Sequence, residues 1–216
     1  MSTFVELGNN AGPLIGVTLN DCAPEILTEF TRQCFFTGEF PSRGKTPYQW
    51  LLDCRAGLGD GEMLQAIARA LLAIASERQQ RQFVGTGFGA YLLVGAMLGL
   101  DASAQGGLVR SQRKSHGRQQ LVEGQIDRQR PVCVIDDVIN SGESASQLVE
   151  ALRNEGFQPD CCLSIFHFEW GGGVERLSRL GVDCDGLARV TQQTLPAATP
   201  AFRWWNFRNL MPWRSN

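Results

Sequence analysis

Two adjacent aspartates, Asp136 and Asp137, follow four apolar residues in the stretch PVCVIDDVINSGES, residues 131–144. Neighbouring carboxylates are costly to bury together, so they need hydroxyl or divalent-metal partners. A short loop with a glycine and small hydroxyls follows and opens a helical pattern, and backbone N–H groups at such a helix start can cradle a phosphate. Carboxylates for hydroxyls beside amides for a phosphate describe a sugar phosphate as the ligand. The alternative is that Asp136 caps a turn and that Ser141 or Ser144 caps the helix.

Strand-like and helix-like segments alternate on both sides of this motif. The patterns predict strands at 50–52, 83–84, 108–109, 132–135, 161–168 and 187–190, and helices from Pro24 to Phe35 and at 62–78, 91–100, 144–154 and 174–180. This alternation predicts an α/β fold with a mostly parallel sheet flanked by helices. The polar segments GTGFGA (85–90), 111–120 and 136–144 each follow a strand, so we expect them at the carboxyl edge of the sheet, where ligands bind.

The composition is that of one ordinary globular domain, with 216 residues, 43% hydrophobic and 19% charged. A formal net charge of −2 gives no bulk attraction to nucleic acid or to an anionic membrane, and neither is expected as a partner. No apolar run approaches the roughly 20 residues of a spanning helix, and the first residues lack a signal-peptide pattern. The seven cysteines include no C-x-x-C pair, which favours a reducing, cytoplasmic location.

Lysine is rare in this chain. Of the 20 basic residues only two are lysines, Lys45 and Lys114. Where lysine persists, a compact ammonium rather than a planar guanidinium can be what the site needs. With so few residues, chance is the alternative explanation.

The stretch VIDDVINSGES resembles the motif with which type I phosphoribosyltransferases bind phosphoribosyl diphosphate (PRPP). Further segments are similar to the orotate phosphoribosyltransferase branch of that family: GEFPSRGKTPY (38–48) followed by Asp53 and Arg55, RSQRKSHGRQQLVEG (110–124) and EWGGGVERLSRLGV (169–182). The resemblance covers roughly residues 38 to 190. It implies the type I phosphoribosyltransferase fold, with a small N-terminal hood segment (1–48), a core (49–190) and a C-terminal tail (191–216).

The resemblance also implies a function and a set of site residues. The expected reaction transfers the 5-phosphoribosyl group from PRPP to a nucleobase, orotate or a related pyrimidine, with release of diphosphate and with Mg²⁺ as cofactor. The implied catalytic residues are Lys114, His116 and Asp137. The implied PRPP-binding residues are Arg110, Asp136, Asp137, Asn140, Ser141, Gly142, Glu143 and Ser144. The implied base-binding residues are Arg43, Lys45 and Phe168. No residue is assigned as a direct metal ligand, and a homodimer is expected, with catalytic loops that reach into the neighbouring site.

Several positions depart from the family pattern. Ser111 and Gly89 stand where the family usually carries lysines, and Glu143 occupies a position that is usually small or hydroxylic. His167 and Phe168 stand where the family often has an Asp-Arg pair that reads the carboxylate of orotate. Two alternatives therefore stay open, a transferase for a base without a carboxylate and a PRPP- or nucleotide-binding regulatory protein with weak or no activity.

The C-terminal stretch AFRWWNFRNLMPWRSN lies outside the resemblance. It holds three of the five tryptophans and no acidic residue. Arginine and aromatic side chains can stack on bases, so a nucleic-acid or membrane-surface role is one reading. The favoured reading is a tail that packs on its own domain or across a dimer.

Overall fold

The computed structural model describes residues 3–7, 15–19, 24–41, 47–109 and 121–192. An eight-stranded sheet forms its centre, in the order β1-β2-β10-β9-β8-β5-β6-β7, and β3 and β4 form a separate two-stranded sheet. The strands are β1 (Thr3–Leu7), β2 (Ile15–Leu19), β3 (Phe35–Phe40), β4 (Tyr48–Leu52), β5 (Gln82–Gly85), β6 (Gln105–Val109), β7 (Val122–Gly124), β8 (Pro131–Ile139), β9 (Gln158–Phe168) and β10 (Asp183–Gln192). Within the described residues, no helix is long and apolar enough to cross a membrane.

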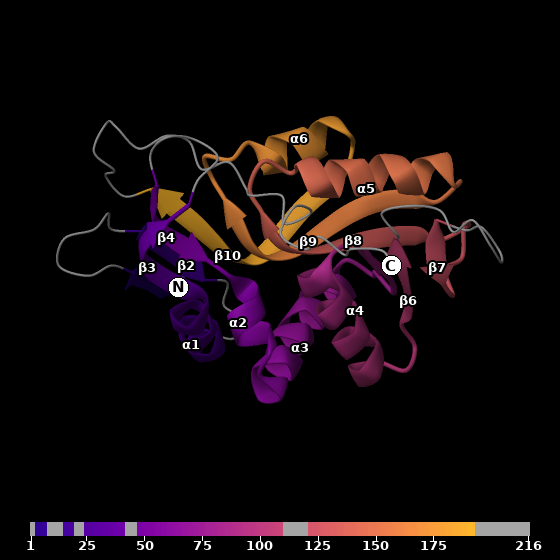
Figure 1. Cartoon of the computed structure of the whole chain (residues 1–216). Coiled ribbons are helices and arrows are strands. Elements are labelled where there is room, and N and C mark those ends of the chain that lie inside the picture. Colours follow the sequence, from indigo (N-terminus) through magenta and orange to yellow (C-terminus); the bar gives the residue numbers. More distant parts are fainter. Residues whose placement is uncertain (1–2, 8–14, 20–23, 42–46, 110–120, 193–216) are drawn as a thin grey trace, which may run out of the picture.

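The middle of the large sheet is parallel and its edges are antiparallel. Strands β10, β9, β8, β5 and β6 pair in parallel, whereas β2 pairs antiparallel with β10 and β7 antiparallel with β6. The helices are α1 (Pro24–Cys34), α2 (Cys54–Leu58), α3 (Gly61–Glu77), α4 (Phe88–Leu100), α5 (Glu143–Asn154) and α6 (Gly173–Arg179). Figure 1 shows α5 and α6 over one face of the sheet and α1 to α4 below the other. The expected fold class is confirmed.

Helix boundaries follow from local chemistry. Asp60 precedes α3, and its carboxylate accepts a hydrogen bond of 2.9 Å from the backbone N–H of Met63, which satisfies one of the unpaired amides at a helix start. Ile67, Leu71 and Ile74 then recur at helical spacing and are buried. This apolar stripe packs α3 onto the sheet. At the far end of α3, Arg78 pairs with Asp183 and, at 2.8 Å, with Asp185, which fastens the helix to the start of β10.

The structure corrects several expected boundaries. Strand β8 does not end before the aspartates but continues through them to Ile139, because β9 pairs with it as far as His167. Helix α1 ends at Cys34, and Phe35 begins β3, which pairs antiparallel with β4. Helix α4 begins three residues earlier than expected, at Phe88. The sequence patterns did not predict β1, β2, β3, β7 or α2.

An aromatic cluster joins the two-stranded sheet to the carboxyl end of β9. The ring of Trp50 stacks between Phe35 at 5.7 Å and Phe168 at 6.1 Å, and Phe168 meets Trp170 edge-on at 4.9 Å. Such pairs contribute about 0.5–1.5 kcal/mol each beyond simple burial. The cluster therefore holds β4, and the residues directly after it, beside the edge where the parallel strands end.

Candidate functional site

The carboxyl ends of four neighbouring parallel strands place the polar segments together. In the order β9-β8-β5-β6, these strands end at Phe168, Ile139, Gly85 and Val109. The segments that begin at Glu169, Asn140 and Thr86 therefore lie on one rim. This confirms the expected arrangement for the loop after β5 and for the loop after β8. Residues 111–120, expected on the same rim after β6, lie outside the described residues.

The two aspartates sit near the end of β8 in an environment that disfavours their charges. Burial, and then the neighbouring charge of Asp137, raise the pKa of the Asp136 carboxyl well above its usual range. Burial also raises the pKa of Asp137, and the charge of Asp53 adds to that rise. Backbone N–H groups donate to both carboxylates, that of Asp137 to Asp136 at 2.9 Å and that of Val138 to Asp137 at 3.0 Å. The pair is therefore suited to hydroxyl donors or to a cation.

Gly89, in the first turn of α4, makes room for Asp137. A Cβ on Gly89 would lie 2.7 Å from the Cγ atom and 2.9 Å from the Cβ atom of Asp137, and it would collide with Oδ2. Real carbon contacts lie near 3.5–4.0 Å. The carboxylate of Asp137 thus rests directly against the first turn of α4.

Asp53 and Arg55 form a rigid pair on the same side of the site. Arg55 donates two side-chain hydrogen bonds to Asp53, from Nε at 2.7 Å and from Nη2 at 2.6 Å, and its backbone N–H donates a third at 3.1 Å. These contacts hold the pKa of Arg55 above its usual value, chiefly through the hydrogen bonds to Asp53. Asp53 also caps α2. The hydrogen bonds to Asp53 therefore hold the guanidinium of Arg55 in place directly after β4, the strand that contributes Trp50 to the aromatic cluster.

The loop after β8 turns into α5 through a left-handed glycine. Asn140 is 2% exposed, and Gly142 adopts the left-handed conformation with φ of 66° directly before α5, a position at which glycine carries no steric cost. Ser141 and Glu143 lie at the surface end of the loop, where the hydroxyl of Ser141 accepts a hydrogen bond of 3.4 Å from the N–H of Glu143. Glu143 and Ser144 are exposed in the first turn of the 12-residue helix α5.

A run of three glycines, Gly171 to Gly173, forms the wall behind this loop. A Cβ on Gly171 would collide with Asn140, and a Cβ on Gly173 would lie 2.8 Å from the backbone nitrogen of Gly142 and 2.7 Å from Ile139. Likewise, a Cβ on Gly142 would lie 2.8 Å from the Cα atom of Gly173. The two turns pack backbone against backbone, so this glycine wall sets the position of the loop. The GGG run is visible in the sequence, but the sequence does not show that it packs against the loop after β8.

Two hydroxyls fix the end of β6. Tyr91 of α4 donates a hydrogen bond of 2.8 Å to the carbonyl of Val109, and Thr86 donates a longer one, of 3.5 Å, to the same oxygen. Val109 is the last described residue before the segment 110–120. Sequence reasoning did not single out Tyr91, although its place directly after GTGFGA could have pointed to it.

The end of β9 is where the resemblance places the base. Phe168 is only 1% exposed, and its ring packs inside the aromatic cluster against Trp50 and Trp170. His167 is partly buried, and burial, followed by the charge of Arg189, lowers its pKa. Arg189 pairs with His167 across β10 and β9 and forms a surface ion pair of 3.4 Å with Glu169. Arg189 therefore places a positive charge near the carboxyl end of β9, and no sequence motif pointed to it.

Five of the expected site residues lie outside the described residues: Arg43, Lys45, Arg110, Lys114 and His116. The roles assigned to them stay predictions. Of the expected residues that are described, the structure brings Asp136, Asp137 and residues 140–144 together at one edge.

The donors in the described residues can be compared with what Mg²⁺ requires. No group of three or more His, Cys, Asp or Glu side chains gathers to hold a metal within this part of the chain. Mg²⁺ does not need such a cage, since it keeps several waters and commonly binds one or two carboxylates together with substrate phosphates. Asp136 and Asp137, whose charges are disfavoured by their surroundings, fit that smaller requirement.

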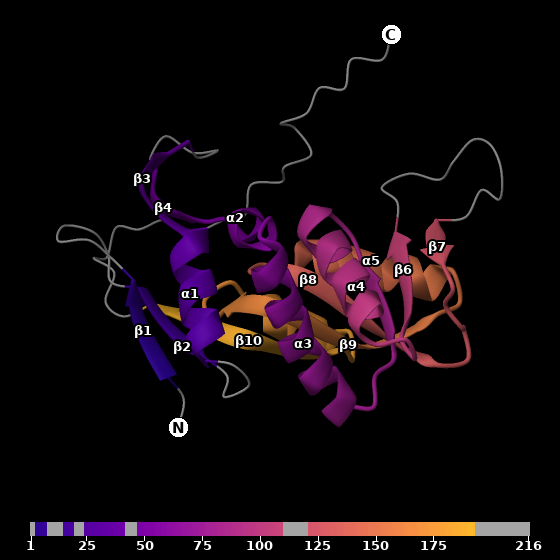
Figure 2. The same ribbon diagram turned by 90° about the horizontal axis from the view of Figure 1, so that it is seen from below.

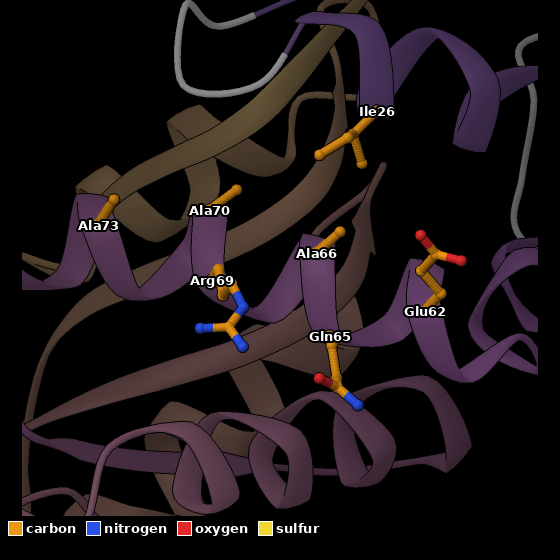
Figure 3. Close-up of a pocket in the computed structure, with 7 residues that line it drawn as sticks. All are labelled: Ile26, Glu62, Gln65, Ala66, Arg69, Ala70 and Ala73. Carbon is orange, nitrogen blue, oxygen red and sulfur yellow. The ribbon is translucent and has the colours of Figure 1, made fainter.

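A groove of about 550 Å³ lies elsewhere, between α1 and α3. Figure 3 shows its lining side chains, among them Ile26 of α1 and Glu62, Arg69 and Ala73 of α3. None of the residues expected at the site lines it. The groove is separate from the edge that carries the aspartates.

Comparison with known proteins finds relatives of the kind that the sequence motifs resemble. No protein-family model matches the chain. It is 28% identical to the orotate phosphoribosyltransferase of Rhodopirellula baltica over 180 residues, 79% of this chain and 92% of the relative. It is 34% identical to that of Bacillus cereus over 109 residues, 50% of this chain, so here the match spans only 52% of the relative.

A solved structure extends the likeness to three dimensions. The orotate phosphoribosyltransferase of Mycobacterium tuberculosis superimposes with a TM-score of 0.70 at 20% identity, over 78% of this chain and 95% of that one. The resemblance in sequence covers roughly residues 38 to 190. This range includes the parallel strands, the aspartates near the end of β8 and the loop before α5. The chain therefore has the fold of type I phosphoribosyltransferases, and it is similar in sequence to the orotate phosphoribosyltransferase branch of that family.

Proposed function

We propose that the protein transfers the 5-phosphoribosyl group from PRPP to a nucleobase nitrogen, with orotate or a related pyrimidine as the acceptor and diphosphate as the second product. The observation that carries this proposal is the pair Asp136–Asp137 directly beside the loop at the start of α5. Two carboxylates suit the ribose hydroxyls, and the backbone amides of residues 140–144 suit the 5′-phosphate. The names of the relatives support the same chemistry.

The reaction exchanges one bond at the anomeric carbon for another. The base nitrogen forms its bond to that carbon while the bond to diphosphate breaks, and the electron pair leaves with diphosphate. Negative charge therefore builds on the leaving group, and cations that close over it lower the barrier. Arg110, Lys114 and His116 are the proposed cations. A polar loop that closes over bound substrate also excludes water, which would otherwise compete with the base.

Mg²⁺ is the proposed cofactor, and Asp136 and Asp137 are the residues that would stand beside it. Mg²⁺ would supply positive charge to the diphosphate and the ribose hydroxyls. The protein's own contribution is orientation. The glycine wall sets the position of the proposed phosphate loop, and Gly89 limits the position of Asp137, so the ribose would be held between two positions that the backbone defines.

Whether the base is orotate depends on which cation would bind its carboxylate. Arg43 and Lys45 are the proposed readers, because the ring of Phe168 is buried in the aromatic cluster and offers no charge. Removing a charged partner of a desolvated carboxylate costs about 2–5 kcal/mol. Arg43→Ala or Lys45→Ala should therefore raise the KM for orotate strongly and leave that for PRPP nearly unchanged.

A second candidate function is a PRPP-binding regulatory protein with weak or no transferase activity. The first turn of α4 favours it, because Gly89 stands where the family usually carries a lysine and no residue of this helix is basic.

One experiment separates the candidates. PRPP with Mg²⁺ should raise the melting temperature, because a ligand that binds only the native state adds about 2.7 kcal/mol at a hundredfold excess over Kd. Asp137→Asn should reduce that shift. The same protein is then incubated with PRPP, Mg²⁺ and a panel of bases, and diphosphate release is measured for each.

The outcomes are distinct. Release with orotate supports the proposal, and Lys114→Ala should then lower turnover far more than PRPP affinity. Release only with bases that lack a carboxylate would change the substrate. A melting shift without release for any base would favour the regulatory protein, and no shift at millimolar PRPP would remove both candidates.

A further inference from the structure

The groove between α1 and α3 is an open, largely apolar surface away from the edge that carries the aspartates. Its volume is about 550 Å³, and its apolar lining consists of Ile26 from α1 and of Ala66, Ala70 and Ala73 from α3. Figure 3 shows the side chain of Ile26 reaching from α1 toward the alanines of α3. Alanine side chains are short and Ile26 is 36% exposed, so the space between the two helices stays accessible to a bulky apolar group.

Two charged side chains stand among these apolar ones. Glu62 and Arg69 both line the groove and are exposed, and neither forms an ion pair with another residue that the structure describes. A carboxylate in this position can pair with a cation, and a guanidinium can stack on the face of an aromatic ring. The groove is therefore suited to an occupant that carries both aromatic and cationic side chains.

The C-terminal segment of the chain has this composition. Residues 202–214, FRWWNFRNLMPWR, contain three tryptophans, two phenylalanines, three arginines and no acidic residue. Tryptophan and arginine are the side chains that most often anchor an interface. Arg203 stands directly before Trp204 and Trp205, so one short stretch offers a ring for the apolar space and a cation for the carboxylate of Glu62.

The segment also begins close enough to reach the groove. It follows β10, which has ten residues and ends at Gln192, and an ion pair of 2.8 Å between Arg78 and Asp185 fastens α3 to that strand. Figure 2 shows α1 and α3 in front of the part of the sheet that contains β10. The strand is about 33 Å long, whereas the twelve residues from Gln192 to Trp204 can span about 40 Å. The connection is therefore long enough to bring Trp204 back along the strand to the two helices.

We propose that the C-terminal segment 202–214 docks in the groove between α1 and α3 of its own chain. An indole of Trp204 or Trp205 fills the space beside Ile26 and the alanines, where only a large ring complements such short side chains. Arg69 stacks on that ring, and an arginine of the segment pairs with Glu62. The proposal does not depend on transferase activity, because none of the residues assigned to PRPP or to the base lines the groove.

The test measures amide hydrogen exchange of residues 202–214 by mass spectrometry in the full chain, with a synthetic peptide of the same sequence as the unprotected reference. Two variants change the groove. Glu62→Lys reverses its acidic charge, and Ala73→Trp fills the space with an indole of the helix itself. Each has a matched control at an exposed residue that does not line the groove: Glu77→Lys on the same helix and Ala102→Trp after α4.

We expect exchange in the wild-type segment to be at least about tenfold slower than in the peptide, since docking excludes solvent from its backbone. Glu62→Lys should lower this protection about fivefold, because a surface ion pair becomes a repulsion. Ala73→Trp should remove the protection, and both controls should keep it. Melting curves check that every variant is folded.

Three results would overturn the proposal: wild-type exchange as fast as in the peptide, protection that survives both groove variants, or protection that the controls lose as well. Protection that falls when the protein is diluted would show that the segment of a second copy occupies the groove, and it would overturn the assignment to the same chain.

Discussion

Substituting Gly89 by alanine tests whether the position of Asp137 is set by the start of α4. At an unconstrained helix position, alanine is favoured over glycine by about 1 kcal/mol. At Gly89 the new Cβ would lie 2.7 Å from the Asp137 Cγ atom, and ordinary contact requires roughly 3.5 Å. The carboxylate must therefore move by about 1 Å, which removes its alignment with a ribose hydroxyl. A hydrogen bond to a charged group contributes about 1.5–3 kcal/mol, so PRPP affinity should fall about 10- to 100-fold.

The assay compares Gly89→Ala with Gly61→Ala, a first-turn glycine of α3 whose Cβ would meet nothing within 4 Å. Melting is measured with and without PRPP and Mg²⁺. At a ligand concentration a hundredfold above the wild-type Kd, a hundredfold loss of affinity would cut the stabilisation from about 2.7 to about 0.4 kcal/mol. Gly61→Ala should keep the full shift. If Gly89→Ala gains stability as the control does and binds PRPP as wild type does, the reasoning about this contact is wrong.

Two further perturbations follow from the charges at the site. In the apo protein, ionised Asp136 is disfavoured by burial and by Asp137, so stability should fall as pH rises from about 4, the ordinary aspartate value, through the raised pKa. Asp136→Asn should remove that slope and raise the melting temperature at neutral pH by about 2–4 °C, the equivalent of about 1 kcal/mol; an unchanged pH profile would contradict this. Arg189→Gln should raise the pKa of His167, because it removes a neighbouring positive charge, whereas Arg189→Lys should not. NMR titration of a chain with two histidines reads this directly, and equal titration of both variants would show that Arg189 does not act on His167.

The sequence predicted the elements whose signals are local. Helix α3 has a capping aspartate and an apolar residue every three or four positions, and the loop after β8 has its glycine at a left-handed position. The expectation that three polar segments share one rim needed only the rule that parallel strands end together, and the structure bears it out for the two segments it describes.

Non-local pairing explains what the sequence did not predict. Asp136 and Asp137 look like a strand end, yet β9 continues to supply partners as far as His167. Phe35 fits a helical pattern, but pairing with Leu52 draws it into β3. The role of Phe168 toward the base stays a prediction. Its burial depends on Trp50 and Trp170, and no local pattern announces that contact.

The glycine wall also has a mechanical consequence. Between Asn140–Gly142 and Gly171–Gly173, main chain touches main chain, so no side chain can rotate to absorb a displacement. The two turns must shift as one body, and α6, which begins at Gly173, must shift with them. A ligand that draws in the loop would therefore also displace the start of α6, which lies on the same face of the sheet as α5 (Figure 1). Amide hydrogen exchange should slow in both turns together upon binding, as a single cooperative unit.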